Sequence, residues 1–449
     1  FAWDPFKDHK VAIRGGFGIF YSPIYGQIAD VVQTLGFVNN TRPIAQVFVP
    51  LTGVPGQPPT LTSALIFQTL FAQGLIQCTT PGAGNVACIT PGSLTQFGIN
   101  VTNTGPPPPL SVVFSGQPNY QNPYAMQGSF GIEGEVAKDL SVSLGYIYVH
   151  TLRLPVAIDT NARPAFATLV PGCTATLHTR CVANGQAVSV HNWNNNPVTS
   201  ALGPAPCAGL AAFLCFANPL LLQTDQYSSA ASALYHGFTL EVKKRFSSHY
   251  SLLGNYTFAK AIDTGTDFNS DFGPFDNTNL AGERGLSSFD QRHKVVVTGI
   301  LATSGRSQIL GGWQLAPIFR WNSPHPFNLL AGADVNGDRH STNDRPIGAG
   351  RNTGIGPNFI DFDLRLTKAF RLTEGAQLQF IAEGFNLANR SNFASVNNVV
   401  GSTCVECQVL GASFNQRGLS NSIAAPNQGL GFTSALTPRQ LQLGARLVF

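Results

Sequence analysis

Ten segments of alternating apolar and polar residues dominate the sequence and constrain its fold more than any other feature. A period of two places successive side chains on opposite faces of a β-strand. In one segment, apolar residues at 238, 240 and 242 alternate with Thr239, Glu241 and Lys243. The segments occupy residues 11–21, 127–137, 140–150, 234–246, 250–260, 292–302, 312–321, 359–370, 376–386 and 439–449. We therefore expect ten strands, each with one apolar and one polar face.

The links between these segments alternate in length. Short links at 138–139, 247–249, 303–311 and 371–375 alternate with long links at 151–233, 261–291, 322–358 and 387–438. A soluble sandwich buries its apolar faces, whereas a membrane barrel turns them to lipid. Short turns on one rim and long loops on the other are typical of outer-membrane barrels, and about 9 to 11 tilted residues cross the hydrocarbon. The pattern predicts an all-β, antiparallel, up-and-down transmembrane barrel with short periplasmic turns and long extracellular loops.

Composition excludes several other classes of protein. Only 11% of residues are charged, against about 25% in ordinary soluble domains. No apolar run approaches the roughly 18 residues of a membrane-spanning helix, and a net charge of +4 is too small to indicate nucleic-acid binding. The sequence contains no H-E-x-x-H, G-x-S-x-G or P-loop motif, so we expect no enzyme.

Two further features concern the ends of the strands and the longest link. Five aromatic residues lie near strand ends, where they could form girdles at the lipid headgroups or serve as ordinary strand aromatics: Tyr146, Tyr148, Tyr250, Trp313 and Trp321. In the longest link, 22–126, residues 44–49 and 110–114 have weak strand patterns.

The chain starts at Phe1 and its one methionine is Met126, so we expect a fragment or a processed product with any targeting segment upstream.

The last segment carries the most specific motif. Leu441, Leu443, Leu447 and the terminal Phe449 share one face of this strand. With Gln442 and Gly444, this pattern resembles the carboxy-terminal signal that the outer-membrane barrel assembly machinery reads. An amphipathic edge strand with a free end can be recognised by strand addition.

Several phrases resemble TonB-dependent transporters of the Oar-like (OmpA-related) type. They are FAWDPFKDHKVAIRGGFGIFY, LEVKKRFSSHYSLLGNYTFAKAID, ERGLSSFDQRHK, DVNGDRHSTNDRP, FIDFDLRLTKAFRL and AEGFNLANRSNF. The resemblance implies that residues 1–449 supply the carboxy-terminal part of the barrel, about 10–11 of 22 strands. A plug, a signal peptide and any carboxypeptidase-regulatory-like domain would lie upstream.

The same resemblance implies a function. We expect energised substrate translocation across the outer membrane of a Gram-negative cell, with outer-membrane lipid, the TonB complex and the barrel assembly machinery as partners. No cofactor is implied, and the substrate is unknown. A passive porin or a surface adhesin on the same barrel is an alternative, as is a soluble secreted β-protein.

The eight cysteines form four local pairs, all within links that the topology places outside the cell. An oxidising exterior permits disulfides, although Cys173, His178 and Cys181, or Cys404 and Cys407, could instead bind zinc. We favour disulfides because neither cluster supplies four ligands. The pairs are Cys78 with Cys88, Cys173 with Cys181, Cys207 with Cys215, and Cys404 with Cys407.

One long link contains a candidate calcium loop. Asp334, Asn336 and Asp338 alternate like the first ligands of such a loop, and Asp344 follows. However, Arg339 and Arg345 stand where Gly and a bidentate Glu would be needed. A polar turn without metal is the alternative.

Another long link is acidic. Asp263, Asp267, Asp271, Asp276, Glu283 and Asp290 face a single base, Arg284. Such a loop could steer cationic ligands by its field, or it could simply carry solvated charge. We expect the charged faces of the strands to hold a plug and interior water, among them Glu133, Glu135, Glu241, Lys243, Asp361, Asp363, Arg365 and Glu383.

Overall fold

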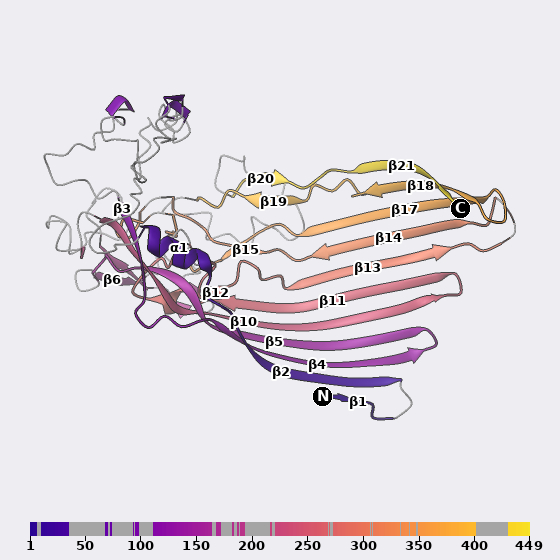
Figure 1. The fold of residues 1–449 in the computed structure, drawn as a ribbon, viewed down its shortest axis with the longest axis horizontal. Coiled ribbons are helices and arrows are strands. Elements are labelled where there is room, and N and C mark those ends of the chain that lie inside the picture. Colours follow the sequence, from indigo (N-terminus) through magenta and orange to yellow (C-terminus); the bar gives the residue numbers. More distant parts are fainter. Residues whose placement is uncertain are drawn as a thin grey trace, which may run out of the picture.

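An open, strongly elongated sheet forms the body of the computed structural model (Figure 1). The structure describes residues 1–6, 10–35, 111–163, 221–267, 273–305, 309–332, 334–340, 342–346, 349–400 and 430–449, together with short stretches within 68–73, 93–97, 168–171, 182–193 and 216–217 and positions 269 and 307. Among these residues, no helix has the length and apolar character needed to span a membrane.

The sheet follows chain order with antiparallel neighbours. Its path is β1-β2-β4-β5-β10-β11-β13-β14-β17-β18-β21, with β12 and β3 paired outside this path. The strands on the path are β1 (Ala2–Trp3), β2 (Val11–Tyr21), β4 (Tyr124–Ala137), β5 (Leu140–Asp159), β10 (Leu221–Ser247), β11 (Tyr250–Asp263), β13 (His293–Ala302), β14 (Trp313–Asn322), β17 (Phe359–Arg371), β18 (Gln377–Phe385) and β21 (Gln440–Val448). All ten predicted strands are confirmed.

The two ends of the sheet differ as the link lengths predict. Short turns join β4 to β5, β10 to β11, β13 to β14 and β17 to β18 at one end, where the carboxy terminus also lies (Figure 1). The described parts of the long links, with α1 (Gly26–Leu35) and β3 (Ser111–Gly116), lie at the other end. We call these the turn end and the loop end.

The two faces of the sheet differ in chemistry. Ladder pairing aligns Ile13, Ile132, Leu144 and Leu240 on one face, which we call the outward face. On this face Trp313 and Trp321 stand eight residues apart on β14. This spacing is about 26 Å of strand, comparable to an apolar band about 25 Å tall.

The opposite, inward face is polar and contains cross-strand ion pairs. Arg14 lies 3.5 Å from Glu133, and Arg365 lies 3.6 Å from Glu383. Arg320 on β14 pairs with both carboxylates of β17, at 2.8 Å from Asp363 and also with Asp361. The acidic residues predicted for this face therefore oppose the apolar residues, as expected.

Two strands extend further at the loop end than the sequence predicts. β5 continues to Asp159 and β10 begins at Leu221, so residues 151–159 and 221–233, predicted to be loop, are strand. Val112, Phe114, Ala157 and Tyr227 form a buried cluster here together with Ile28 of α1. The extension escapes detection because it is covered on both faces and loses the alternation that marks a strand with one apolar face.

The predicted strand at 110–114 corresponds to β3, which pairs with β10 in parallel, the one parallel ladder among the named strands. The predicted strand at 44–49 lies outside the described residues. Short hairpins decorate the long links: β6 (Thr168–Pro171) pairs with β9 (Ser189–Asn192), β7 (Val182–Ala183) with β8 (Gln186–Ala187), β15 (Pro326–Phe327) with β16 (Gly354–Ile355), and β19 (Phe393–Val396) with β20 (Phe432–Ala435). The strand β12 (Gly285–Leu286) pairs with β11.

Candidate functional site: a polar core among the outer loops

Three long links, from β5 to β10, from β11 to β13 and from β14 to β17, join in a shared core at the loop end. The Trp193 side chain is fully buried, and its backbone N–H donates to the Asn336 carbonyl at 2.6 Å. The Asn336 amide donates in turn to the carbonyl of Phe275 at 2.8 Å. Because polar groups in these contacts are buried and paired, the three links form one structure, which we call the outer-loop core.

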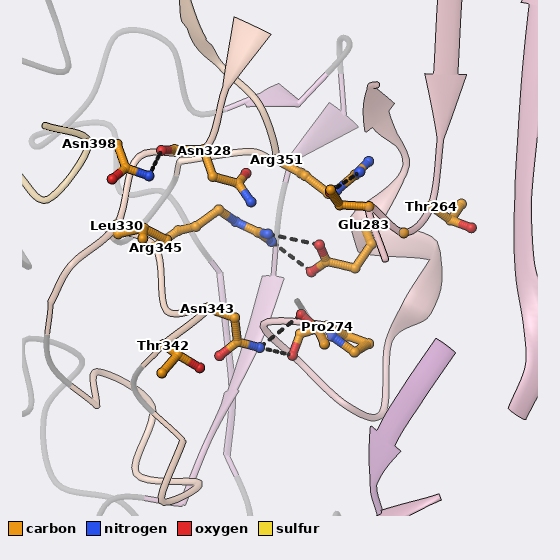
Figure 2. A pocket seen from close by; sticks show the side chains of 13 residues that line it. Thr264, Pro274, Glu283, Asn328, Leu330, Thr342, Asn343, Arg345, Arg351 and Asn398 are labelled. Carbon is orange, nitrogen blue, oxygen red and sulfur yellow. Dashed lines mark hydrogen bonds and ion pairs between the residues drawn. The ribbon is translucent and has the colours of Figure 1, made fainter. Parts of the chain in front are cut away.

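A buried ion pair lies beside a small cavity in this core. Arg345 donates from both terminal nitrogens to the Glu283 carboxylate, at 2.8 and 2.7 Å (Figure 2). Its guanidinium lies over the ring of Phe275. Burial alone would raise the pKa of Glu283, but the charge and hydrogen bonds of Arg345 outweigh it and hold that pKa below its usual value. The bidentate geometry fixes the orientation of both side chains.

A second arginine, Arg351, also lines the cavity. Arg351 pairs with the Asp263 carboxylate and donates to the Thr266 hydroxyl at 2.7 Å. The backbone of Arg351 also approaches Gly285 closely: a Cβ at position 285 would lie 2.7 Å from the Arg351 carbonyl oxygen. Glycine is therefore required where β12 meets this loop.

The cavity is about 80 Å³ in volume and is lined by both polar and apolar groups. Asn343 donates to the Gly273 and Pro274 carbonyls at 2.9 and 2.6 Å (Figure 2). Its own carbonyl oxygen, and the Nε of Arg345, have no hydrogen-bond partner among the described residues. A volume of this size can hold about two water molecules, and one donor and one acceptor are available to bind them.

The predicted calcium residues Asp334, Asn336, Asp338 and Asp344 lie in the same core. The Asp334 carboxylate accepts from the backbone N–H of Gly337 at 2.6 Å and of Arg339 at 3.0 Å. Among the described residues, no group of three or more His, Cys, Asp or Glu is arranged to hold a metal ion. The calcium site stays a prediction.

These carboxylates nevertheless crowd one another. Burial, and then the charges of Asp344, Asp334 and Asp159, raise the pKa of Asp338 well above its usual value. Burial and the charge of Asp334 do the same for Asp344. Burial raises the pKa of Asp159, at the end of β5, to about 6. One oxygen each of Asp159 and Asp344 has no hydrogen-bond partner among the described residues.

Four of the six acids in the predicted acidic link are buried, and the ligand-steering role stays a prediction; the buried acids are Asp263, Asp276, Glu283 and Asp290. Asp263 is buried against Arg351, and Asp276 is buried with its carboxylate 2.7 Å from His191. Asp267 is exposed, and Asp271 lies outside the described residues. The sequence did not reveal these pairings, because Arg345 and Arg351, which neutralise Glu283 and Asp263, come from the next long link.

The remaining predicted site residues are separate from this core. Gln442, Gly444, Leu447 and Phe449 lie on or directly after β21, which pairs along one edge with β18. The Phe449 side chain is 91% exposed. All eight cysteines lie outside the described residues, so their pairing stays a prediction.

A family model described as "Outer membrane beta barrel domain" matches the chain over residues 1–349 and 346–442. A comparison with curated proteins finds no match.

Among solved structures, the chain is similar to the outer membrane transporter YddB from Escherichia coli, with 9% identity, a TM-score of 0.46, and coverage of 100% of this chain and 39% of that one. It is also similar to a ferripyoverdine receptor from Pseudomonas aeruginosa, with 12% identity, a TM-score of 0.34, and coverage of 73% and 27%. The chain is similar as well to the ferric preacinetobactin receptor BauA from Acinetobacter baumannii, with 10% identity, a TM-score of 0.33, and coverage of 73% of this chain and 30% of that one. The chain thus spans well under half the length of each.

Proposed function

Because the chain belongs to the outer membrane beta-barrel domain family, we propose that it is the carboxy-terminal part of the barrel of an Oar-like, TonB-dependent transporter. The family places the chain in the outer membrane. The proposal adds that further strands, a plug and a TonB-contacting segment precede residue 1 in the complete protein, and that transport is energised through TonB.

The observation that supports this proposal best is the path of eleven strands in chain order, with short turns at one end and long links at the other. This is half of the 22 strands of plugged outer-membrane transporters. The sequence phrases that resemble Oar-like proteins are spread across these strands and their links. Together they favour a large transporter barrel over a small pore.

In the proposed transporter, the inward face of the sheet would contact the plug and catalyse no reaction. Its carboxylates and guanidiniums are paired across strands, as in Arg320 with Asp361 and Asp363. A charged, hydrated wall can hold a plug by polar contacts that exchange with water when the plug moves. We propose no catalytic role for the chain.

The outer-loop core would form the external surface that a substrate meets first. Its buried pairs, Glu283 with Arg345 and Asp263 with Arg351, hold the links from β11 and β14 in one arrangement. The barrel assembly machinery is a proposed partner at β21, through Leu447 and Phe449.

The test is site-specific photo-crosslinking of the complete protein to TonB in living cells, with the probe placed in the segment upstream of Phe1. A crosslink that disappears when TonB is deleted supports the proposal. Ion conductance of the purified protein in planar bilayers, without any crosslink, would instead support the alternative of a passive porin. Neither signal, with cell-surface attachment retained, would support an adhesin.

A further inference from the structure

Charged residues are sorted by sign between the two faces of the membrane-spanning strands. In β4, in residues 140–150 of β5, in residues 234–247 of β10 and in the path strands from β11 to β21, the ladder register places no Asp or Glu on the outward face, which carries Leu144, Leu240 and Leu364. The acids of these segments, such as Glu133 and Glu241, lie on the inward face. The charged or imidazole side chains that do occupy the outward face are all basic.

These basic residues lie at the two borders of the apolar face. At the turn end, Lys244 lies over the ring of Tyr250 and Lys368 over the ring of Trp313. At the loop end, His150, His236, Lys260 and His293 stand on four neighbouring strands. His236 and Lys244 are eight residues apart on β10, about 26 Å of strand, so each group lies near one membrane surface.

The loop-end group is organised by aromatic neighbours. The Tyr146 hydroxyl lies 2.7 Å from Nδ1 of His236, and the Tyr256 hydroxyl lies 2.9 Å from Nδ1 of His293. With the tyrosines as donors, the proton of each neutral ring is on Nε2. His293 also stacks with Trp321, at 6.0 Å between ring centroids. Each imidazole therefore has a fixed orientation and a donor that its tyrosine does not use.

Lys260 is the centre of this group. It is directly opposite His236 in the β10–β11 ladder. Its side chain is exposed, and it makes no hydrogen bond or ion pair with the residues that the structure describes. No Asp or Glu lies beside Lys260 on this face, so its charge is available to an anion from the membrane.

We propose that His236, Lys260 and His293 form a binding site for the phosphate group of an anionic lipid in the outer leaflet. The site lies on the outward face, which contacts lipid in this family, at the border where the apolar residues end. A lysine ammonium and imidazole N–H groups are suitable donors to phosphate oxygens, and the adjacent Phe238 and Phe258 would lie along the acyl chains. The inference rests on membrane location and does not depend on TonB coupling.

The experiment is a binding titration of the complete protein in detergent, read by native mass spectrometry. The probes are diphosphoryl lipid A, the same lipid after enzymatic dephosphorylation, and inorganic phosphate as competitor. Wild-type protein should retain the phosphorylated lipid and bind the dephosphorylated form at least about tenfold more weakly. One lysine near a membrane surface contributes about fivefold in affinity, so Lys260→Gln should weaken binding about fivefold, and Lys260→Gln with His236→Gln should weaken it further.

Lys294→Gln is the matched control, because Lys294 adjoins His293 in sequence but lies on the inward face. It should bind like wild type, as should Lys260→Arg, which keeps the charge. Resistance of the folded band to detergent at room temperature verifies that each variant is folded. Equal affinity for phosphorylated and dephosphorylated lipid, or equal losses in Lys260→Gln and Lys294→Gln, would overturn the proposal. Displacement of the lipid by millimolar inorganic phosphate would show a site for free anions and would also overturn it.

Discussion

At the residue scale, Glu283 and Arg345 form a buried, bidentate ion pair in the outer-loop core. Both side chains are almost completely buried, and loss of one partner from such a pair typically costs about 3 to 5 kcal/mol. Glu283→Gln should therefore loosen the core, and hydrogen exchange at the Phe275 amide, which donates to Glu283, should accelerate. The exposed pair of Arg14 and Glu133 provides the control, since Arg14→Gln should cost about 1 kcal/mol or less. Equal effects of the two substitutions would contradict this ranking.

The crowded carboxylates predict a pH dependence of opposite sign to ordinary acid denaturation. Asp159 has an ordinary pKa of 3.8 and a raised pKa of about 6 in the fold. Between these values the folded form binds more protons than the unfolded form, so stability falls as pH rises. Asp338 and Asp344 act in the same direction.

Lowering the pH from 7 to 5 should slow protease cleavage within residues 330–345, on the order of tenfold for one raised group, after correction for the protease's own pH profile. Asp338→Asn should reduce this dependence. A cleavage rate that rises towards pH 5 would contradict the assignment.

Calcium offers a second way to neutralise the same carboxylates. If the predicted site of Asp334, Asn336, Asp338 and Asp344 forms, millimolar calcium should protect residues 330–345 from protease at pH 7.5. Magnesium, which prefers a stricter octahedral geometry, should protect less. Asp334→Asn should abolish the difference between the two ions. No protection by calcium in wild-type protein would leave the loop as a polar turn.

At the element scale, neighbouring residues of β5 test the assignment of the two faces. Leu144 is on the outward face, opposite Ile132 and Leu240, whereas Ser143 lies between Glu133 and Glu241 on the inward face. Leu144→Arg should cost about 2 to 4 kcal/mol near the midplane, measured by urea unfolding in lipid vesicles. Ser143→Arg should cost little, because its guanidinium gains two acidic neighbours. Inverted costs would mean that the faces are exchanged.

The same alternation explains which elements the sequence could predict. Strands with one apolar and one polar face were found in all ten cases. The parts of β5 beyond residue 150 and of β10 before residue 234 were missed because they are buried without alternation, as the consecutive buried residues Pro155, Val156 and Ala157 show.

The outer-loop core was only partly predictable. Asp334 and Asp338 were recognised as a group because they are close in sequence. The partnerships of Glu283 with Arg345 and of Asp263 with Arg351 span 62 and 88 residues, and no local spacing specifies them.

At the scale of the whole molecule, the sidedness of the strands gives a further test. An epitope tag inserted between residues 194 and 215, in the link from β5 to β10, should bind antibody on intact cells. A tag between Ser247 and Ser248, in the turn from β10 to β11, should bind antibody only after the outer membrane is permeabilised. The reverse labelling would invert the topology of the whole sheet.

The outer-loop core also sets an order of events during assembly. Trp193, Phe275 and Asn336 come from three different links, so the core cannot close until β17 has joined the sheet and both ends of the third link are fixed. The other two links stay open until then, and the conformational entropy that each loses on closure is lost in one late step. Contacts of this range form slowly. In a nascent barrel, the membrane-spanning strands would thus pair before the outer-loop core closes. Substitutions that disrupt this core would delay folding of the outer loops without preventing membrane insertion.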